Sequence, residues 1–233
     1  MTLRRALRPL KCVMLDRERW AARLEAVAKK TLGENPVVPD GHGFRDDRGN
    51  RLEIDGPFFA ALAGARGECA PNARTDVRLW AWLTGVEPGP ELRLLTQKPW
   101  PDKFTPAPLL PRQRDDEAIE VYTDLLLCAT HAAWAIAGAP GSCTALDHNA
   151  VERGNLRRRC VLGCGWLMHN LQPDNATNYP WAVHVLLECS DALGYEATHY
   201  AETLLHNCQV TYGKADLRSA WILWHAAGEL RRG

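Results

Sequence analysis

Histidines and carboxylates recur one or two helical turns apart in three segments of the chain. Residues separated by three, four or seven positions share one face of an α-helix, so each set predicts a narrow polar stripe. The three sets are Glu117, Glu120, Asp124 and His131 in the segment 115–137, His184, Glu188 and Asp191 in the segment 180–193, and His199, Glu202 and His206 in the segment 196–212.

Neutral imidazoles and ionised carboxylates are ligands for Zn, Mn or Fe, and they also exchange protons as general acids and bases. If the stripes face one another, they form a pocket for such chemistry. The candidate catalytic residues are Asp124, His131, His184 and Glu188, and the candidate metal ligands are His199, Glu202 and His206. The alternative, which the frequency of such pairs on helix surfaces favours, is that each stripe is a solvated edge.

The densest basic cluster is Arg157-Arg158-Arg159, which could bind a phosphate or an acidic partner. Arg17, Arg19 and Arg23 could extend a basic surface on an earlier helix. The chain, however, has 28 Lys and Arg against 28 Asp and Glu, and thus no net charge. A neutral chain is not typical of a nucleic-acid binder, so we expect both clusters to be solvated helix faces.

Trp221 and Trp224 lie on one face of a predicted helix beside Leu217. They could form an exposed patch that binds a partner if the rest of the bundle leaves them uncovered. Otherwise they are anchors of the core, as we expect for most of the nine tryptophans of the chain.

The eight cysteines are spread over 233 residues, mostly within apolar helical segments. This favours buried, reduced thiols and a cytoplasmic protein over a disulfide framework. The longest uncharged run, 125–146, contains an apolar part of roughly 15 residues, and a bilayer needs about 20. We therefore expect neither a membrane span nor a cleaved leader. The excess of arginine over lysine is typical of bacteria with GC-rich genomes.

Helices must position the stripes in the second half of the chain. Periodic apolar residues bounded by Asp, Gly and Pro predict a bundle of about five helices. Their expected bounds are 115–137, 148–170, 180–193, 196–212 and 217–230. The apolar residues of the segment 180–193 surround its stripe almost completely, so this helix is expected at the centre.

The first half of the chain predicts a small α+β part. Its expected elements are a helix at 16–32, a β-hairpin at 44–54 that turns at Arg48-Gly49-Asn50, and helices at 57–63 and 76–83. Five prolines in 98–111 predict a connector. The sequence thus predicts a mainly α fold with an N-terminal part (1–97), a proline-rich connector (98–111) and a helical bundle (112–233).

Three short segments resemble a bacterial helical family that is known only as a domain of unknown function. They are RLWAWLTGV (78–86), DLLLCATHAAWAIA (124–137) and RRRCVLGCGWL (157–167). The pair His131 and Trp134 is offset from the adjacent His-Trp of that family, and residues 170–233 lie outside the resemblance. The resemblance implies a helical fold but no activity and no catalytic residues.

Neutral charge, tryptophan-rich helices and the lack of a catalytic signature favour a binding protein over an enzyme. We therefore expect a bacterial accessory, adaptor or immunity-type factor that binds another protein, with no cofactor. The alternative is a metal-dependent or acid–base enzyme whose histidines and carboxylates line a pocket between the bundle helices, with Zn, Mn or Fe as the metal.

Overall fold

The computed structural model describes residues 15–39, 43–46, 48–63, 105–112, 116–138, 150–173 and 178–233. Within these ranges the fold is mainly α, with eight helices and one two-stranded hairpin. This confirms the fold class that the sequence predicts. The helix expected at 76–83 lies outside the described residues, as do residues 98–104 of the proline-rich connector.

The N-terminal elements begin at side-chain caps that the sequence makes recognisable. Helix α1 (Arg17–Leu32) begins after Asp16, whose carboxylate accepts the N–H of Arg19, and ends at Gly33 with φ 79°. Strands β1 (Phe44–Arg45) and β2 (Arg51–Leu52) pair antiparallel. Helix α2 (Gly56–Leu62) is capped by the carboxylate of Asp55.

Two long helices follow, α5 (Ile119–Gly138) and α6 (Ala150–Asn170). Helix α6 is continuous although it contains three glycines, each of which weakens a helix by about 1 kcal/mol relative to alanine. One face of α6, with Leu156, Cys160 and Cys164, is buried against its neighbours. Packing of this face outweighs the weak helix propensity.

The helix expected at 180–193 is in fact two short ones. Helix α7 (Val183–Glu188) and helix α8 (Ser190–Leu193) are separated at Cys189, and residues 180–182 form a turn. Ala182 adopts a left-handed conformation (φ 56°, ψ 12°), which ends any helical path through 180–182.

The last two helices are α9 (Tyr195–Asn207) and α10 (Leu217–Arg232). Helix α9 ends five residues before the predicted end at Tyr212, because the chain turns between Cys208 and Gly213. Helix α10 begins at Asp216, whose carboxylate accepts the N–H of Ser219 at 2.7 Å.

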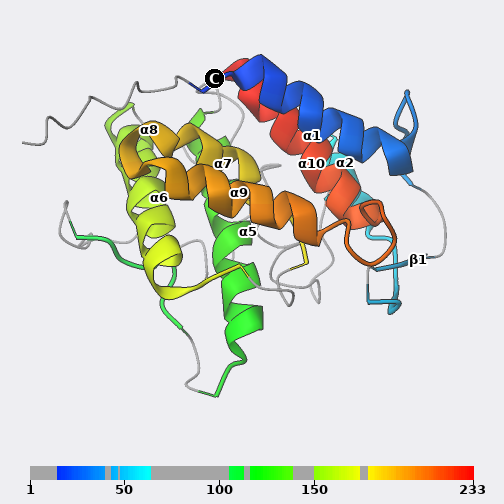
Figure 1. Cartoon of the computed structure of the whole chain (residues 1–233), viewed down its shortest axis with the longest axis horizontal. Helices are drawn as coiled ribbons and strands as arrows, with labels where there is room; N and C mark the ends of the chain where they lie inside the picture. Colours follow the sequence, from blue (N-terminus) through cyan, green and yellow to red (C-terminus); the bar gives the residue numbers. More distant parts are fainter. Residues whose placement is uncertain are drawn as a thin grey trace, which may run out of the picture.

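Helices α1 and α10 lie side by side along their whole length (Figure 1). They are antiparallel: Arg231 near the end of α10 bonds Glu18 and Glu25 of α1, and Thr31 donates to the carbonyl of Ala215 just before α10. The N-terminal helix thus shares one core with the C-terminal helices.

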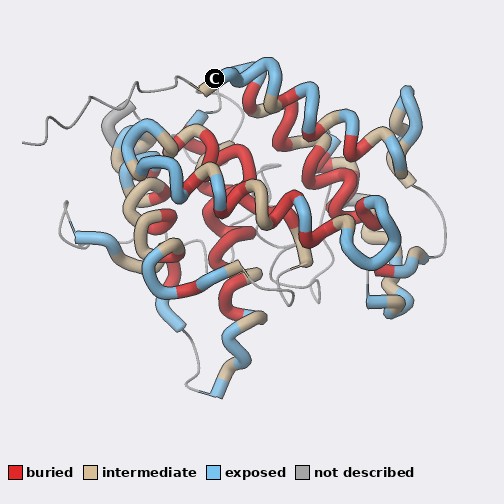
Figure 2. The backbone as a smooth tube through the Cα atoms, viewed as in Figure 1, coloured by how far each residue is buried: buried red, intermediate tan, exposed pale blue. Residues whose placement is uncertain are grey.

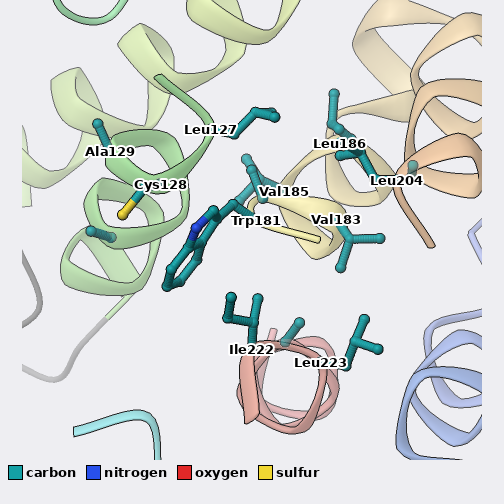
Figure 3. Packing of buried hydrophobic residues seen from close by; sticks show 14 of the residues in the cluster. Leu127, Cys128, Ala129, Trp181, Val183, Val185, Leu186, Leu204, Ile222 and Leu223 are labelled. Carbon is teal, nitrogen blue, oxygen red and sulfur yellow. The ribbon is translucent and has the colours of Figure 1, made fainter. Parts of the chain in front are cut away.

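The buried residues follow the contact between α5, α7, α9 and α10 (Figure 2). At its centre Trp181 is completely buried, with Cys128 of α5 and Ile222 of α10 on either side (Figure 3). Trp181 also meets Phe58 of α2 edge to face. This core brings three polar side chains together, as described below.

Candidate functional site: a buried histidine cluster

Three histidines from three helices pack against one another in the core. His131 of α5 lies 4.3 Å from His184 of α7 and 5.2 Å from His225 of α10, measured between ring centroids. The rings of His131 and His184 are fully buried, and the side chain of His225 is 9% exposed. We call these residues the histidine cluster.

Hydrogen bonds determine where His131 carries its proton. The backbone N–H of Ala182 donates to Nδ1 of His131 at 3.2 Å, so Nδ1 must be an acceptor. In a neutral imidazole the other nitrogen then carries the hydrogen. Nε2 of His131 therefore donates to Nδ1 of His225 at 3.0 Å.

Beyond His225, a longer contact leads toward the surface. Because Nδ1 of His225 accepts, neutral His225 carries its hydrogen on Nε2. That nitrogen lies 3.6 Å from Oε1 of Glu229, one turn later on α10, and Glu229 bonds Arg232. The sequence of groups from the core outward is thus Ala182, His131, His225, Glu229 and Arg232.

The backbone of Ala182, whose N–H donates to His131, is strained. A left-handed conformation costs a residue with a Cβ about 1 kcal/mol or more. Among the described residues other than glycine, Ala182 alone has a positive φ. Such strain persists where the surrounding structure imposes it, and here it accompanies an N–H that points at His131.

His184 differs from the other two histidines because neither of its ring nitrogens has a hydrogen-bond partner, although both are buried. One of them carries a hydrogen in the neutral ring, so a buried donor and a buried acceptor are left unsatisfied. Each such group costs about 1–3 kcal/mol. The ring is held instead by its edge-to-face contact with His131.

Burial disfavours a charge on all three rings. It lowers the pKa of His131 and of His184 well below 6.5, and the neighbouring histidines lower each pKa further. Burial, followed by repulsion from Arg232, lowers the pKa of His225 to about 3. The histidine cluster is therefore neutral at pH 7.

Two glutamates border the cluster. Burial raises the pKa of Glu229, while Arg232 beside it acts in the opposite direction. Glu188 accepts a hydrogen bond from Arg17 of α1 at 2.6 Å, and its charge adds to the upward shift of the pKa of Glu229. Each carboxylate therefore has an arginine on its outer side.

The structure brings two of the three predicted stripes together. His131 and His184 meet in the core, and Glu188 lies one turn from His184 at the border. Asp124 is seven residues before His131, about 10 Å along α5 at 1.5 Å per residue. Asp124 is thus not part of the cluster.

His225 and Glu229 are the members that the sequence stripes missed. They lie at i and i+4 in WHAAGEL, on a helix whose other buried residues are mostly apolar. A single His and a single Glu, four residues apart on the buried face of such a helix, are the sequence signal that could have identified this pair. The neighbouring tryptophans, Trp221 and Trp224, indicate instead a face that packs in the core.

The third stripe, on α9, faces solvent. His199 and His206 are exposed, His199 stacks on Tyr195, and Glu202 forms an ion pair with Arg23 at 3.3 Å. No group of three or more His, Cys, Asp or Glu side chains within the described ranges is placed to hold a metal ion. The stripe therefore lies on a helix surface and is not assembled as a metal site.

The three consecutive arginines of α6 point to different places. Arg157 lies over the ring of Trp134 at 5.0 Å, and Arg159 donates to the carbonyl of Leu109 at 3.2 Å. Arg158 is exposed. Because two of the three side chains pack against α5 and the segment 105–112, they do not form one phosphate site.

Trp221 and Trp224 do not form the exposed patch on α10 that was the alternative to a role in the core. Trp221 is 1% exposed and belongs to the core, while Trp224 is partly buried and packs against it. The bundle therefore covers the surface that these two residues could have offered to a partner.

The five cysteines in the described residues are buried, and none of them forms a disulfide bond. Burial raises the pKa of the Cys160 thiol, and a hydrogen bond with Cys189, together with burial, raises that of Cys164. A thiol attacks as its thiolate, so these environments do not activate a nucleophile.

No described helix is long and apolar enough to cross a membrane. No family model, curated protein or solved structure matches this chain. The resemblance over 78–167 therefore stays a prediction.

Proposed function

We propose that the protein acts by binding another protein, through a surface that α1 and α9 share. We call this surface the α1–α9 face and define it as Trp20, Arg23, Tyr195, His199, Glu202 and His206. The observation that carries the proposal is Tyr195, which is 76% exposed and yet stacked on His199.

A large exposed ring that is already ordered suits an interface. The rings of Tyr195 and His199 are 6.4 Å apart between centroids and tilted by 12°. Stacking restricts the side-chain rotamers before a partner arrives, so less conformational entropy is lost on binding. Tyrosine, tryptophan and arginine are also the residue types that contribute most to binding energy in protein interfaces.

One ion pair links α1 to α9 within this face. The guanidinium of Arg23 lies 4.5 Å from the ring centroid of Trp20 and bonds Glu202 of α9. An exposed ion pair of this kind contributes about 0–1 kcal/mol to stability. Arg23 and Glu202 can therefore exchange partners at little cost to the fold.

The position of the reactive groups supports binding over catalysis. A catalytic base must lie within hydrogen-bond reach of its substrate. The rings of His131 and His184 are fully buried. Two surface hollows in the described residues lie elsewhere, beside the hairpin at Arg45 and between Leu109 and Arg159.

The proposal is tested by affinity capture from an extract of the source organism with three forms of the protein. We expect the wild type to recover one protein in stoichiometric amount and Tyr195→Ala to recover at least tenfold less. Tyr212→Ala is the matched control, because Tyr212 is also exposed but lies outside the α1–α9 face. Equal recovery by all three forms excludes the face, and the lack of any stoichiometric protein excludes the function.

We further propose that the protein works in the bacterial cytoplasm. The buried thiols of the described residues form no disulfide bond, which supports a reducing compartment. Labelling the free thiols in freshly lysed cells, before and after reduction, tests this proposal. An increase in labelling after reduction would show that cysteines are paired in the cell.

Acid–base catalysis is the second candidate function, favoured by the meeting of His131 and His184 beside Glu188. It requires an opening that admits substrate to the cluster. Screening ester, amide and phosphate substrates with the wild type and His184→Ala tests it. A hydrolytic rate that is equal in both forms excludes the cluster as its source.

A further inference from the structure

We propose that the histidine cluster is an acid-operated latch: protonation of His131, His184 and His225 releases α10, together with α1, from α5 and α7. The inference does not depend on the proposed binding function. It rests on which hydrogen bonds the three rings can make when they carry an additional proton.

The bond between His131 and His225 joins α5 to α10, and it requires that Nδ1 of His225 carries no proton. A second proton on His225 occupies Nδ1, which then faces Nε2–H of His131 at 3.0 Å, hydrogen against hydrogen. A second proton on His131 occupies Nδ1, where the N–H of Ala182 already points. Either protonation therefore turns a hydrogen bond into a repulsive contact.

The charges would also repel one another. His184 and His225 lie 4.3 Å and 5.2 Å from His131 between ring centroids, so protonated rings place like charges within the core. The ionisable groups that lower the pKa values of the three rings are the histidines themselves and Arg232 of α10. Glu229 faces Nε2 of His225 at 3.6 Å and would favour a charge on that ring.

The bordering carboxylates do not compensate. Glu229 of α10 already bonds Arg232 and also feels the charge of Arg157 of α6. Glu188 of α7 is bonded by Arg17 of α1. A protonated ring would have to compete with an arginine for either carboxylate.

Helix α10 is the element that can leave, with α1 attached. The bonds from Arg231 to Glu18 and Glu25, and from Thr31 to Ala215, hold the two helices together without any histidine. Across the interface that must open, α1 is tied to α7 and α9 by the ion pairs Arg17–Glu188 and Arg23–Glu202, whose arginines are half exposed. The Arg23–Glu202 pair is exposed on both sides and is therefore weak, whereas the Glu188 side chain of the other pair is largely buried.

Hydrogen exchange on the full chain at pH 7.5 and pH 5.5 tests the latch, with rates corrected for the intrinsic effect of pH. For the wild type we expect peptides of α1 and α10 to exchange at least tenfold faster at pH 5.5. Peptides of α5 and α9 should keep their protection. Unchanged protection of α10, or equal loss in all helices, would overturn the proposal.

A double variant, His225→Asn with His184→Leu, removes two of the charges. The Asn carbonyl oxygen can replace Nδ1 as the acceptor for His131, and leucine replaces a ring that has no hydrogen-bond partner. We expect this variant to lose most of the acid response of α10. The matched control His169→Gln, at an exposed histidine of α6, should respond like the wild type. A full response in the double variant would contradict the latch.

The proton count of the wild type gives a measurement that needs no variant. Opening of α10 should consume at least two protons, which appears as a dependence of the opening constant on the square of the proton concentration or steeper. A first-power dependence, or none, would overturn the proposal.

Discussion

Nε2 of His131 donates to Nδ1 of His225 across 3.0 Å, and a backbone N–H on the far side of His131 determines the direction of this bond. The interface between α5 and α10 is thus held by a polar contact whose donor and acceptor cannot be exchanged. A core built in this way depends on the protonation state of its histidines.

Stability should fall steeply in mild acid. The pKa of each clustered histidine is lowered in the folded state, so below about pH 6.5 the unfolded chain binds more protons than the fold. The free energy of unfolding is therefore unaffected by these groups above pH 6.5 and decreases as the pH falls. Three histidines give a slope of up to about 4 kcal/mol per pH unit.

Urea unfolding at intervals between pH 7.5 and pH 5 measures this slope. The raised pKa of Glu229 acts in the opposite direction, because its protonation in mild acid favours the fold. A slope that corresponds to less than one proton would show that the histidines are not buried as a neutral cluster. The variant His184→Leu should reduce the slope by about one proton.

Replacing His184 and replacing His131 should have opposite effects at pH 7.5. His184→Leu removes two unsatisfied buried nitrogens and should raise the free energy of unfolding by about 1 kcal/mol. His131→Leu leaves the N–H of Ala182 and Nδ1 of His225 without this partner and should lower it by about 2 kcal/mol or more. Thermal or urea unfolding measures both, and effects of the same sign would contradict the assigned hydrogen bonds.

The sequence predicted the helices well where caps and periodicity agree. Asp16, Asp55 and Asp216 each cap the helix that was expected after them. The breaks at Ala182 and Cys189 could not be predicted, because Pro180 is compatible with the first turn of a helix and no glycine or proline lies between Ala182 and Cys189. At Ala182 the left-handed backbone accompanies a tertiary contact, the bond from its N–H to His131.

The histidine cluster, too, could be predicted from the sequence only in part. The periodicity of α5 and α7 places His131 and His184 correctly on one face, but periodicity does not tell which faces meet. The stripe on α9 has the same pattern and lies in solvent, with His199 and His206 exposed. His225 of α10, and no histidine of α9, lies beside His131. Predicting this would require knowing that α10 pairs antiparallel with α1.

The N-cap of α10 should help to fix the orientation of α10 and of α1, which pairs with it. The carboxylate of Asp216 is buried and accepts the N–H of Ser219 at 2.7 Å. Asp216→Ala should lower the free energy of unfolding by about 1–2 kcal/mol, since an N-cap side chain satisfies a helical N–H that has no other partner. Urea unfolding measures the loss. Asp16→Ala is the control at an exposed cap, and a smaller loss is expected there.

Arg218 should not tolerate lysine. Its guanidinium lies 5.0 Å from the ring centroid of Phe58 and 5.2 Å from that of Tyr179, and the residue is 4% exposed. A planar guanidinium can stack on aromatic rings, whereas an ammonium is compact and strongly hydrated. Arg218→Lys should therefore lower the free energy of unfolding by about 1–2 kcal/mol, although the charge is kept. Arg158→Lys, at an exposed arginine of α6, should change it by less than about 0.5 kcal/mol, and equal effects in the two variants would show that the stacking contributes nothing.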